Sequence, residues 1–146
     1  MSRETFINRT ISILHRYKQW FLAQRLGQYG LPIEVGQIPV LVQVYRYHGI
    51  SQDGISTNAV LDKGTVARVV KQLEESGLVV RQTDECDRRV NRIYPTPKAL
   101  ELEGNVFGLL RELQEIMYQG FTQEEIEHVN SLLERMKGNI ERIRPV

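Results

Sequence analysis

The stretch that decides the fold reads LDKGTVARVVKQLEESGLVV and occupies residues 61–80. Asp62 is a good N-cap residue, and Gly77 supplies the left-handed backbone that commonly ends a helix. Four apolar residues at helical spacing between them predict a buried stripe, namely Val66, Val69, Val70 and Leu73. We therefore predict a helix over residues 63–76 with a polar, basic outer face. That face carries Thr65, Arg68, Lys71 and Gln72.

A β-hairpin is predicted directly after this helix. Residues 78–81 are rich in β-branched side chains, and residues 90–94 offer a second short strand with apolar positions. The loop over residues 83–89 reads TDECDRR, which gives the hairpin a charged tip. Pro95 and Pro97 are expected to end the second strand and to start another helix.

A short, poor helix interrupted by Gly54 is expected over residues 51–58, with a turn at residues 61–62. The order of short helix, tight turn, capped helix with a basic face and basic-tipped hairpin is that of a winged helix-turn-helix. In the major groove, such a helix brings Arg68 to base edges and phosphates. Arg88 or Arg89 can enter a minor groove, where the negative potential favours a guanidinium.

The flanking segments are predicted to be helical, so the fold class is mainly α with a small β-hairpin wing. Helices are expected over residues 4–28, 34–47 and 98–119. A capping box at Thr122 and Glu125 starts a last helix. The first helix is apolar on two faces, and the last carries an apolar seam at three- and four-residue steps. These faces indicate contact with another subunit.

The amino-acid composition and the distribution of charge limit the classes of protein to which this chain can belong. With 41% hydrophobic and 25% charged residues, the chain is expected to form one globular unit without a membrane span. A single cysteine, Cys86, excludes an internal disulfide, and no targeting signal is visible, so a cytoplasmic location is expected. The net charge is only +1, but it is segregated. Residues 1–30 hold five basic residues against one acidic, whereas residues 99–146 hold five against nine.

The same residues resemble the MarR family of regulators. The similarity is carried by residues 61–79 and by the segment from Asp84 to Arg89, and it runs ungapped from about Ser51 to Lys98. It implies a homodimer with a helical dimerisation region at residues 1–32 and 98–146. Residues 33–97 would form the winged helix-turn-helix DNA-binding domain, with the recognition helix at 63–76 and the wing at 81–93.

The resemblance also implies a function. Such proteins regulate transcription at pseudo-palindromic operators, here expected as a repressor, and small phenolic ligands such as salicylate relieve the binding. The candidate DNA-binding residues are Ser51, Gln52, Lys63, Gly64, Thr65, Arg68, Lys71, Asp87, Arg88 and Arg89. For the ligand, Arg16, Tyr17, Tyr45 and His48 would supply a cation and aromatic walls. No cofactor is expected.

Three positions depart from the family pattern. Val60 stands where a turn glycine is usual, and Gly54 weakens the helix before it, so the docking of that helix is expected to differ in detail. Ala99 replaces a glycine that often follows the wing.

The sequence leaves two alternative functions open. A winged-helix module that binds proteins usually lacks the basic residues found here on the recognition helix and wing. A redox sensor through Cys86 is a further alternative, although flanking acidic residues oppose thiolate formation. No nucleophile with its base is recognisable, and the three histidines lack a metal-like spacing, so neither catalysis nor a metal site is expected.

Overall fold

The computed structural model describes residues 6–144, and the chain divides in sequence between Leu110 and Arg111 into two compact units. The first unit holds α1 (Phe6–Gln28), a 3-10 helix (Val35–Gln37), α2 (Ile38–Arg46), β1 (Ile50–Ser51), α3 (Gln52–Ala59), α4 (Lys63–Glu75), β2 (Val79–Thr83) and β3 (Asn91–Pro95). Helix α5 (Pro97–Met117) crosses the boundary, and α6 (Gln123–Glu141) lies in the second unit. The predicted start of the first helix at Glu4 lies outside the described residues.

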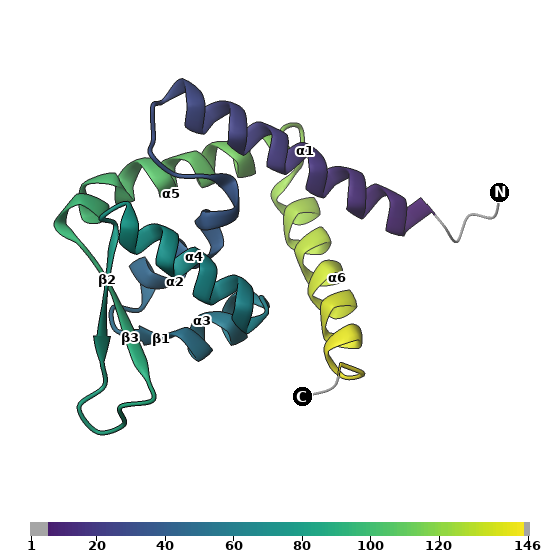
Figure 1. The fold of residues 1–146 in the computed structure, drawn as a ribbon. Coiled ribbons are helices and arrows are strands. Elements are labelled where there is room, and N and C mark those ends of the chain that lie inside the picture. Colours follow the sequence, from purple (N-terminus) through teal and green to yellow (C-terminus); the bar gives the residue numbers. More distant parts are fainter. Residues whose placement is uncertain (1–5, 145–146) are drawn as a thin grey trace. The chain divides into compact units, whose positions relative to one another are not determined.

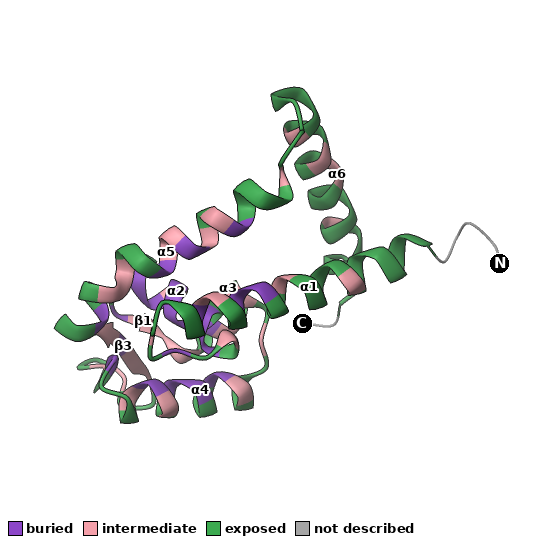
Figure 2. Cartoon of the chain, turned by 90° about the horizontal axis from the view of Figure 1, so that it is seen from above, coloured by how far each residue is buried: buried purple, intermediate pink, exposed green. Residues whose placement is uncertain are grey.

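Helix α4 has the ends and the buried stripe predicted for it. The Asp62 carboxylate accepts a hydrogen bond from the Thr65 backbone N–H at 2.6 Å, and Gly77 follows the helix with φ +74°. Val66, Val69, Val70 and Leu73 are all at most 3% exposed. Figure 2 shows buried residues along one side of α4 and exposed residues along the other. Burial of this stripe therefore fixes which face of the helix reaches solvent.

The core of the first unit lies between α2, α3, α4, the sheet and the first turns of α5. Its fully buried aliphatic side chains come from all of these elements, and they include Leu41, Ile55, Leu78, Ile93, Val106 and Leu109. Helix α1 contributes only residues near its C-terminal end, namely Phe21, Leu22 and Leu26. The hairpin is anchored to this core through Ile93, while its tip extends beyond α2, α3 and α4 (Figure 1).

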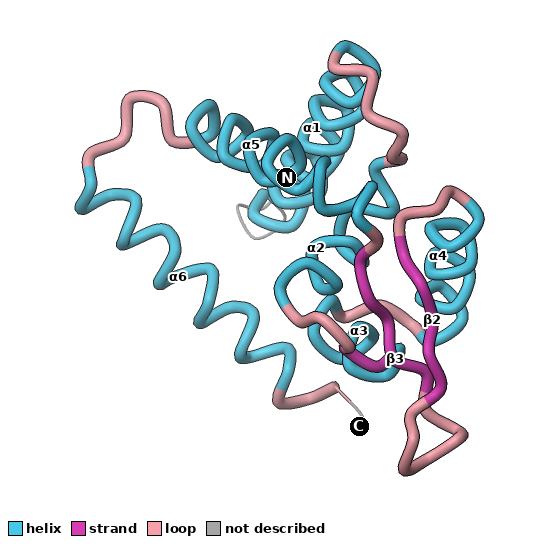
Figure 3. The backbone as a smooth tube through the Cα atoms, turned by 90° about the vertical axis from the view of Figure 1, so that its left-hand side faces the viewer, coloured by secondary structure: helices cyan, strands magenta, loops and turns pink. Residues whose placement is uncertain are grey.

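The sheet has three strands where the sequence predicted two. Its order is β1-β3-β2, and both pairings are antiparallel. The strand β1 is only two residues long, and its Ile50 pairs with Ile93. So short a segment has no alternation to read, which is why the pattern missed it. Figure 3 shows β2 and β3 running side by side to the loop that joins them.

Gly54 does not interrupt α3, contrary to the prediction. A Cβ built on Gly54 would lie 3.0 Å from Cγ1 of Ile50 and 3.2 Å from Oγ of Ser51. The glycine therefore allows the first turn of α3 to pack closely on the residues before it, and its backbone N–H donates to Oγ of Ser51 at 2.9 Å.

The turn after α3 keeps the conformation that a glycine would favour. Val60 ends α3 with φ 55° and ψ 50°, and among residues 6–144 it is the only non-glycine residue with a positive φ. A β-branched residue in this region is strained, because its Cβ approaches the backbone. The departure from the expected glycine thus costs strain and leaves the turn intact.

The 3-10 helix accounts for two differences from prediction. It starts the segment predicted as one helix over residues 34–47, and the α-helix itself begins at Ile38. Gln72 does not point away from the core, because it is half-buried and accepts a hydrogen bond from Gln37 at 3.3 Å. The Gln37 side chain also accepts from the Glu34 backbone N–H at 3.0 Å, so it joins the start of α2 to α4.

The second unit contains the end of α5 and all of α6. The predicted capping box is confirmed, because Thr122 accepts from the Glu125 backbone N–H at 3.1 Å and Glu125 accepts from that of Thr122 at 3.0 Å. Tyr118 supports the turn, since its hydroxyl donates to Asn130 at 2.9 Å. Along residues 6–144, no helix is long and apolar enough to span a membrane.

Candidate nucleic-acid interface

The outer face of α4 carries the predicted cations. Lys63, Arg68 and Lys71 are exposed. The ammonium of Lys63 lies 3.7 Å from the Asp53 carboxylate of α3, and both side chains are 79% exposed. An ion pair so open to water contributes little to stability. Lys63 therefore remains available to an anion brought to this face.

The N-terminus of α4 is built by Asp62 and Thr65. Besides the backbone contact, the Thr65 hydroxyl donates to the Asp62 carboxylate at 2.9 Å, and both contacts lower the pKa of Asp62. Thr65 is consequently part of the cap and is half-buried. A Cβ on Gly64 would have Asp62 Oδ1 as its nearest neighbour at 3.5 Å, an ordinary contact. The fold itself therefore accepts a side chain at residue 64.

The segment between β2 and β3, which we call the wing loop (residues 84–90), holds the candidate DNA-binding residues Asp87, Arg88 and Arg89. The Arg89 guanidinium donates to both oxygens of Asp87, at 3.1 and 3.2 Å, so Asp87 braces Arg89. These bonds lower the pKa of the Asp87 carboxyl. The Arg89 side chain is nevertheless 90% exposed, and Arg88 is exposed as well. Both guanidinium groups can reach a ligand without a rearrangement of the core.

The structure brings the wing loop and the start of α3 around one hollow of about 160 Å³. Its lining includes Arg89 together with Ser51 and Gln52. Ser51 is the N-cap of α3, and Gln52 Oε1 is buried without a hydrogen-bond partner among the described residues. Three of the ten predicted DNA-binding residues, from two separate segments, therefore share one surface.

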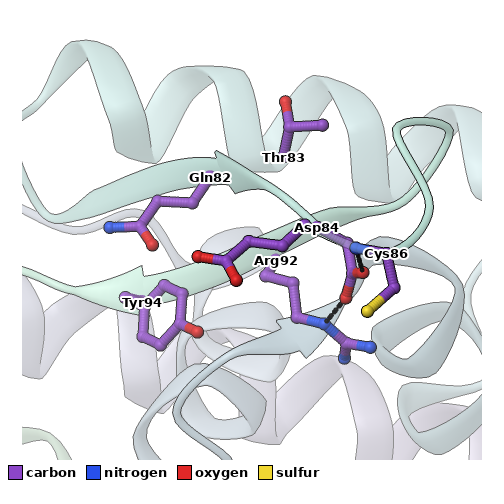
Figure 4. A pocket seen from close by; sticks show the side chains of 7 residues that line it. Gln82, Thr83, Asp84, Cys86, Arg92 and Tyr94 are labelled. Atoms are coloured by element: carbon purple, nitrogen blue, oxygen red, sulfur yellow. Dashed lines mark hydrogen bonds and ion pairs between the residues drawn. The ribbon is translucent and has the colours of Figure 1, made fainter.

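Sequence reasoning missed the residues that hold the wing loop at its base. The Asp84 carboxylate accepts from Nε of Arg92 at 2.7 Å and from the Cys86 backbone N–H at 2.8 Å (Figure 4). These contacts and one from the Asp87 N–H lower the pKa of Asp84. Asp84 and Arg92 border a second hollow, of about 280 Å³. Asp84 and Arg92 are eight residues apart in sequence. They meet because of the register between β2 and β3, which the sequence pattern did not determine.

The four predicted ligand residues have different surroundings. Tyr45 is only 5% exposed, and its hydroxyl donates to the Ala99 carbonyl oxygen at 2.5 Å. Burial raises the pKa of Tyr45 to about 12, and Glu103 adds to the shift. Its ring centroid lies 5.9 Å from that of Phe107. By contrast, Arg16, Tyr17 and His48 are exposed. In this chain, Tyr45 acts as a core residue that joins α2 to α5.

Cys86 is exposed on the wing loop and borders the hollow beside Arg92 (Figure 4). A redox role for this thiol stays a prediction. Over the part of the chain that the structure describes, no three His, Cys, Asp or Glu side chains are grouped to hold a metal ion.

Comparison with known proteins shows which family has similar sequences. The family model described as "MarR family" matches residues 33–90. The HTH-type transcriptional regulator YybA of Bacillus subtilis (strain 168), itself described as uncharacterized, is 34% identical over 116 residues, which are 77% of this chain and 75% of YybA.

Two solved structures are similar over most of the chain. A MarR transcriptional regulator from Methanosarcina mazei Go1 is 35% identical with a TM-score of 0.83, and the match covers 94% of this chain and 99% of that one. A putative MarR family regulator from Listeria monocytogenes, solved in complex with a 26mer DNA, shares the fold at 24% identity with a TM-score of 0.83. That match covers 90% of this chain and 87% of the other.

Proposed function

This chain belongs to the MarR family of non-enzymatic, DNA-binding transcriptional regulators, and we propose that it acts as a homodimer in which both copies of α4 and of the wing loop engage one pseudo-palindromic operator. One observation carries the proposal. The exposed cations of α4 and the exposed arginines of the wing loop belong to one compact unit, and Arg89 shares a hollow with the start of α3. The Listeria relative solved with DNA supports the same use of this fold.

Each element has a separate role in this proposal. Helix α4 lies in the major groove, where Arg68 reads a guanine edge and Lys71 contacts phosphate. Gly64, which the fold does not require, lets the backbone at the helix start approach a phosphate. Arg88 and Arg89 reach into the adjacent minor groove, with Arg89 braced by Asp87. Because the operator is symmetric, two copies place their helices about 34 Å apart.

The exposed apolar faces of the terminal helices support a homodimer. In α1, Tyr17 is 66% exposed and Trp20 is 62% exposed, with Ile7, Ile11 and Leu14 also open to water. In the second unit, Ile140 is 68% exposed and Ile143 is 81% exposed. Helix α6 has no buried residue at all within the described chain. Apolar surface on this scale is typical of an interface, and a second copy supplies a matching face by symmetry.

For the effector, we propose a small aromatic carboxylate such as salicylate. Arg16 offers a cation and Tyr17 an aromatic face, and both are exposed on α1. His48 is exposed just after α2, and Tyr45 in the last turn of α2 would supply an aromatic wall, with its hydroxyl already bonded to Ala99. Ligand binding would favour dimers whose recognition helices no longer fit the operator, so that repression in the cytoplasm is relieved.

Selection from a random double-stranded DNA pool tests this function. The purified full-length protein is incubated with the pool at near-physiological salt, with and without salicylate, and bound fragments are sequenced. An inverted repeat that salicylate releases is the expected result. An inverted repeat that salicylate leaves bound would retain the DNA-binding dimer and exclude this effector. Failure to enrich any sequence would favour the protein-interaction module.

A further inference from the structure

The Asp84 carboxylate organises the start of the wing loop. One oxygen, Oδ1, accepts from the backbone N–H groups of Cys86 and Asp87, at 2.8 and 3.0 Å. The other, Oδ2, accepts from Nε of Arg92 at 2.7 Å. The Asp84 side chain is only 18% exposed, compared with 41% for Asp87. The first two contacts shape the loop locally, whereas the third ties it to the middle strand of the sheet.

Arg92 continues the connection into the body of the domain. On β3 it lies opposite Gln82 of β2 and opposite Ser51, the N-cap of α3. Its Nη1 donates to the Gly49 carbonyl oxygen at 3.2 Å, so one guanidinium contacts both the wing loop and the segment before β1. A single Arg side chain suits such a role, because its donors have a fixed geometry.

The acceptor for Arg92 is itself held in a fixed place. Gly49 has φ +88°, and its backbone N–H donates to the Ile93 carbonyl oxygen at 2.9 Å. A Cβ on Gly49 would lie 2.9 Å from the Tyr94 hydroxyl oxygen, so a side chain here would have to displace this ring as well as adopt a positive φ. The series of contacts from Asp84 through Arg92 therefore ends on Gly49, which is buried and whose backbone is held by a hydrogen bond.

We propose that Asp84 and Arg92 are a positioning pair that fixes the wing loop relative to α3 and α4, so that the wing arginines and the recognition helix reach DNA together. This rests on the proposed function, in which Arg88 and Arg89 contact DNA. The core does not fix the position of either arginine side chain, because both are exposed. The hydrogen bonds described above join Arg89 to Asp87, which lies in the same loop. A loop that is already ordered before binding pays less conformational entropy on contact with DNA.

The substitution Asp84→Asn separates this role from simple charge effects. Removal of a negative charge near DNA should by itself strengthen binding. Asparagine keeps an oxygen for the two backbone N–H groups but loses the ion pair with Arg92. The proposal therefore predicts binding that is weaker, by roughly three- to ten-fold, to the duplex recovered in the selection above. The matched control is Glu85→Gln, which removes the same charge from the neighbouring exposed position and should bind as well as the parent or better.

A double-mutant cycle tests whether Asp84 acts through the wing arginines. In a chain that already carries Arg88→Ala and Arg89→Ala, Asp84→Asn should have no further weakening effect. The slope of log affinity against log salt should also fall in Asp84→Asn, by about 0.9 for each phosphate that the variant no longer neutralises. A merely structural role would lower the unfolding temperature without changing this slope. The variant Arg92→Lys should weaken binding partly, because one ammonium cannot copy both guanidinium contacts.

The outcomes are distinguishable. Weaker binding in Asp84→Asn that disappears in the Arg88→Ala/Arg89→Ala background supports the positioning pair. Equal behaviour of Asp84→Asn and Glu85→Gln, with clear weakening by Arg88→Ala/Arg89→Ala, overturns the positioning pair and leaves the proposed function standing. If Arg88→Ala/Arg89→Ala binds like the parent, the wing contact itself is wrong, and the positioning role fails with it. Should Asp84→Asn fail to fold, Arg92→Lys decides between the first two results through the same cycle.

Discussion

Helix α4 and the wing loop both present arginines to solvent, but different kinds of contact hold them. Helix α4 is fixed by apolar burial, since Val66, Val70 and Leu73 are fully buried beneath Arg68. The wing loop is fixed by polar contacts around Asp84 and Asp87 at its surface. The helix thus gains its position from the free energy that also folds the domain, whereas the loop depends on charged hydrogen bonds that can be removed singly.

The largest expected effect comes from the helix core. Leu73→Ala should lower the free energy of unfolding by about 2–5 kcal/mol, because it leaves a cavity beneath α4. Chemical denaturation at neutral pH measures the loss. The matched variant is Arg89→Ala on the wing loop, which should leave this free energy within about 0.5 kcal/mol of the parent. Equal losses in the two variants would remove the distinction between the helix and the loop.

A smaller effect is expected for DNA recognition by the helix. Arg68→Ala should weaken operator binding by about 1–3 kcal/mol and relax the preference at one base position in each half-site. The reason is that a guanidinium in the major groove contacts a guanine edge with two donors. Repetition of the DNA selection with this variant measures both changes. A preference profile identical to that of the parent would mean that Arg68 faces elsewhere.

A substitution in the wing loop is expected to change DNA affinity in a different way. Arg89→Ala should weaken binding to all sequences about equally, and the slope of log affinity against log salt should fall by about 1 for each phosphate that is no longer neutralised. A minor-groove guanidinium senses backbone potential more than base identity. Titrations of the selected duplex and of a scrambled duplex at several salt concentrations provide the measurement. Selective weakening for the selected duplex alone would assign Arg89 to direct base readout.

The turn that precedes α4 offers a gain in stability. Val60→Gly should raise the free energy of unfolding by about 1 kcal/mol, because the relieved cost of a β-branched residue at φ 55° exceeds the loss from a more flexible unfolded chain. Val60 is 58% exposed, so the glycine variant gives up little packing. Thermal unfolding of parent and variant measures the change. A less stable glycine variant would show that the turn is not strained.

The smallest effect concerns the cap of α4. The Thr65 amide and hydroxyl hold the pKa of Asp62 below its usual 3.8. The ionised cap therefore stabilises the fold fully above pH 3.8, and this contribution disappears as the pH falls through the lowered pKa. Asp62→Asn keeps an oxygen acceptor without titration, so its unfolding temperature should decline less than that of the parent below pH 4. Parallel declines would show that Asp62 is not linked to folding.

The same contrast explains how far the sequence could predict the structure. Apolar periodicity and the end signals Asp62 and Gly77 defined α4, because both are local. The cations on its outer face followed directly. In the wing, the Asp87 contact to Arg89 was also local. The contacts of Arg92 with Asp84 and Gly49 were not, since they depend on strand register and on a two-residue strand. Likewise, the Gln37 contact that turned Gln72 inward joins residues 35 positions apart.

The prediction that residues 1–32 and 98–146 form one dimerisation region concerns an assembly of two chains, and it remains a prediction. Tyr45, one of the predicted ligand residues, shows a second kind of feature that a sequence pattern does not distinguish. An aromatic residue on an amphipathic helix gives the same pattern whether it lines a ligand cavity or packs in the core. Only the hydrogen bond to Ala99 and the contact with Phe107 identify it as a core residue in this chain.

The most direct test of the proposed DNA-binding surface is the affinity of the double variant Arg68→Ala/Arg89→Ala for the selected duplex, measured at two salt concentrations. The two residues lie on separate elements and act on different grooves in the proposed complex, so their effects should add within about 0.5 kcal/mol, and the salt dependence should fall. A double variant that binds the duplex as tightly as the parent would contradict this surface, because DNA would then have to meet some other face of the protein.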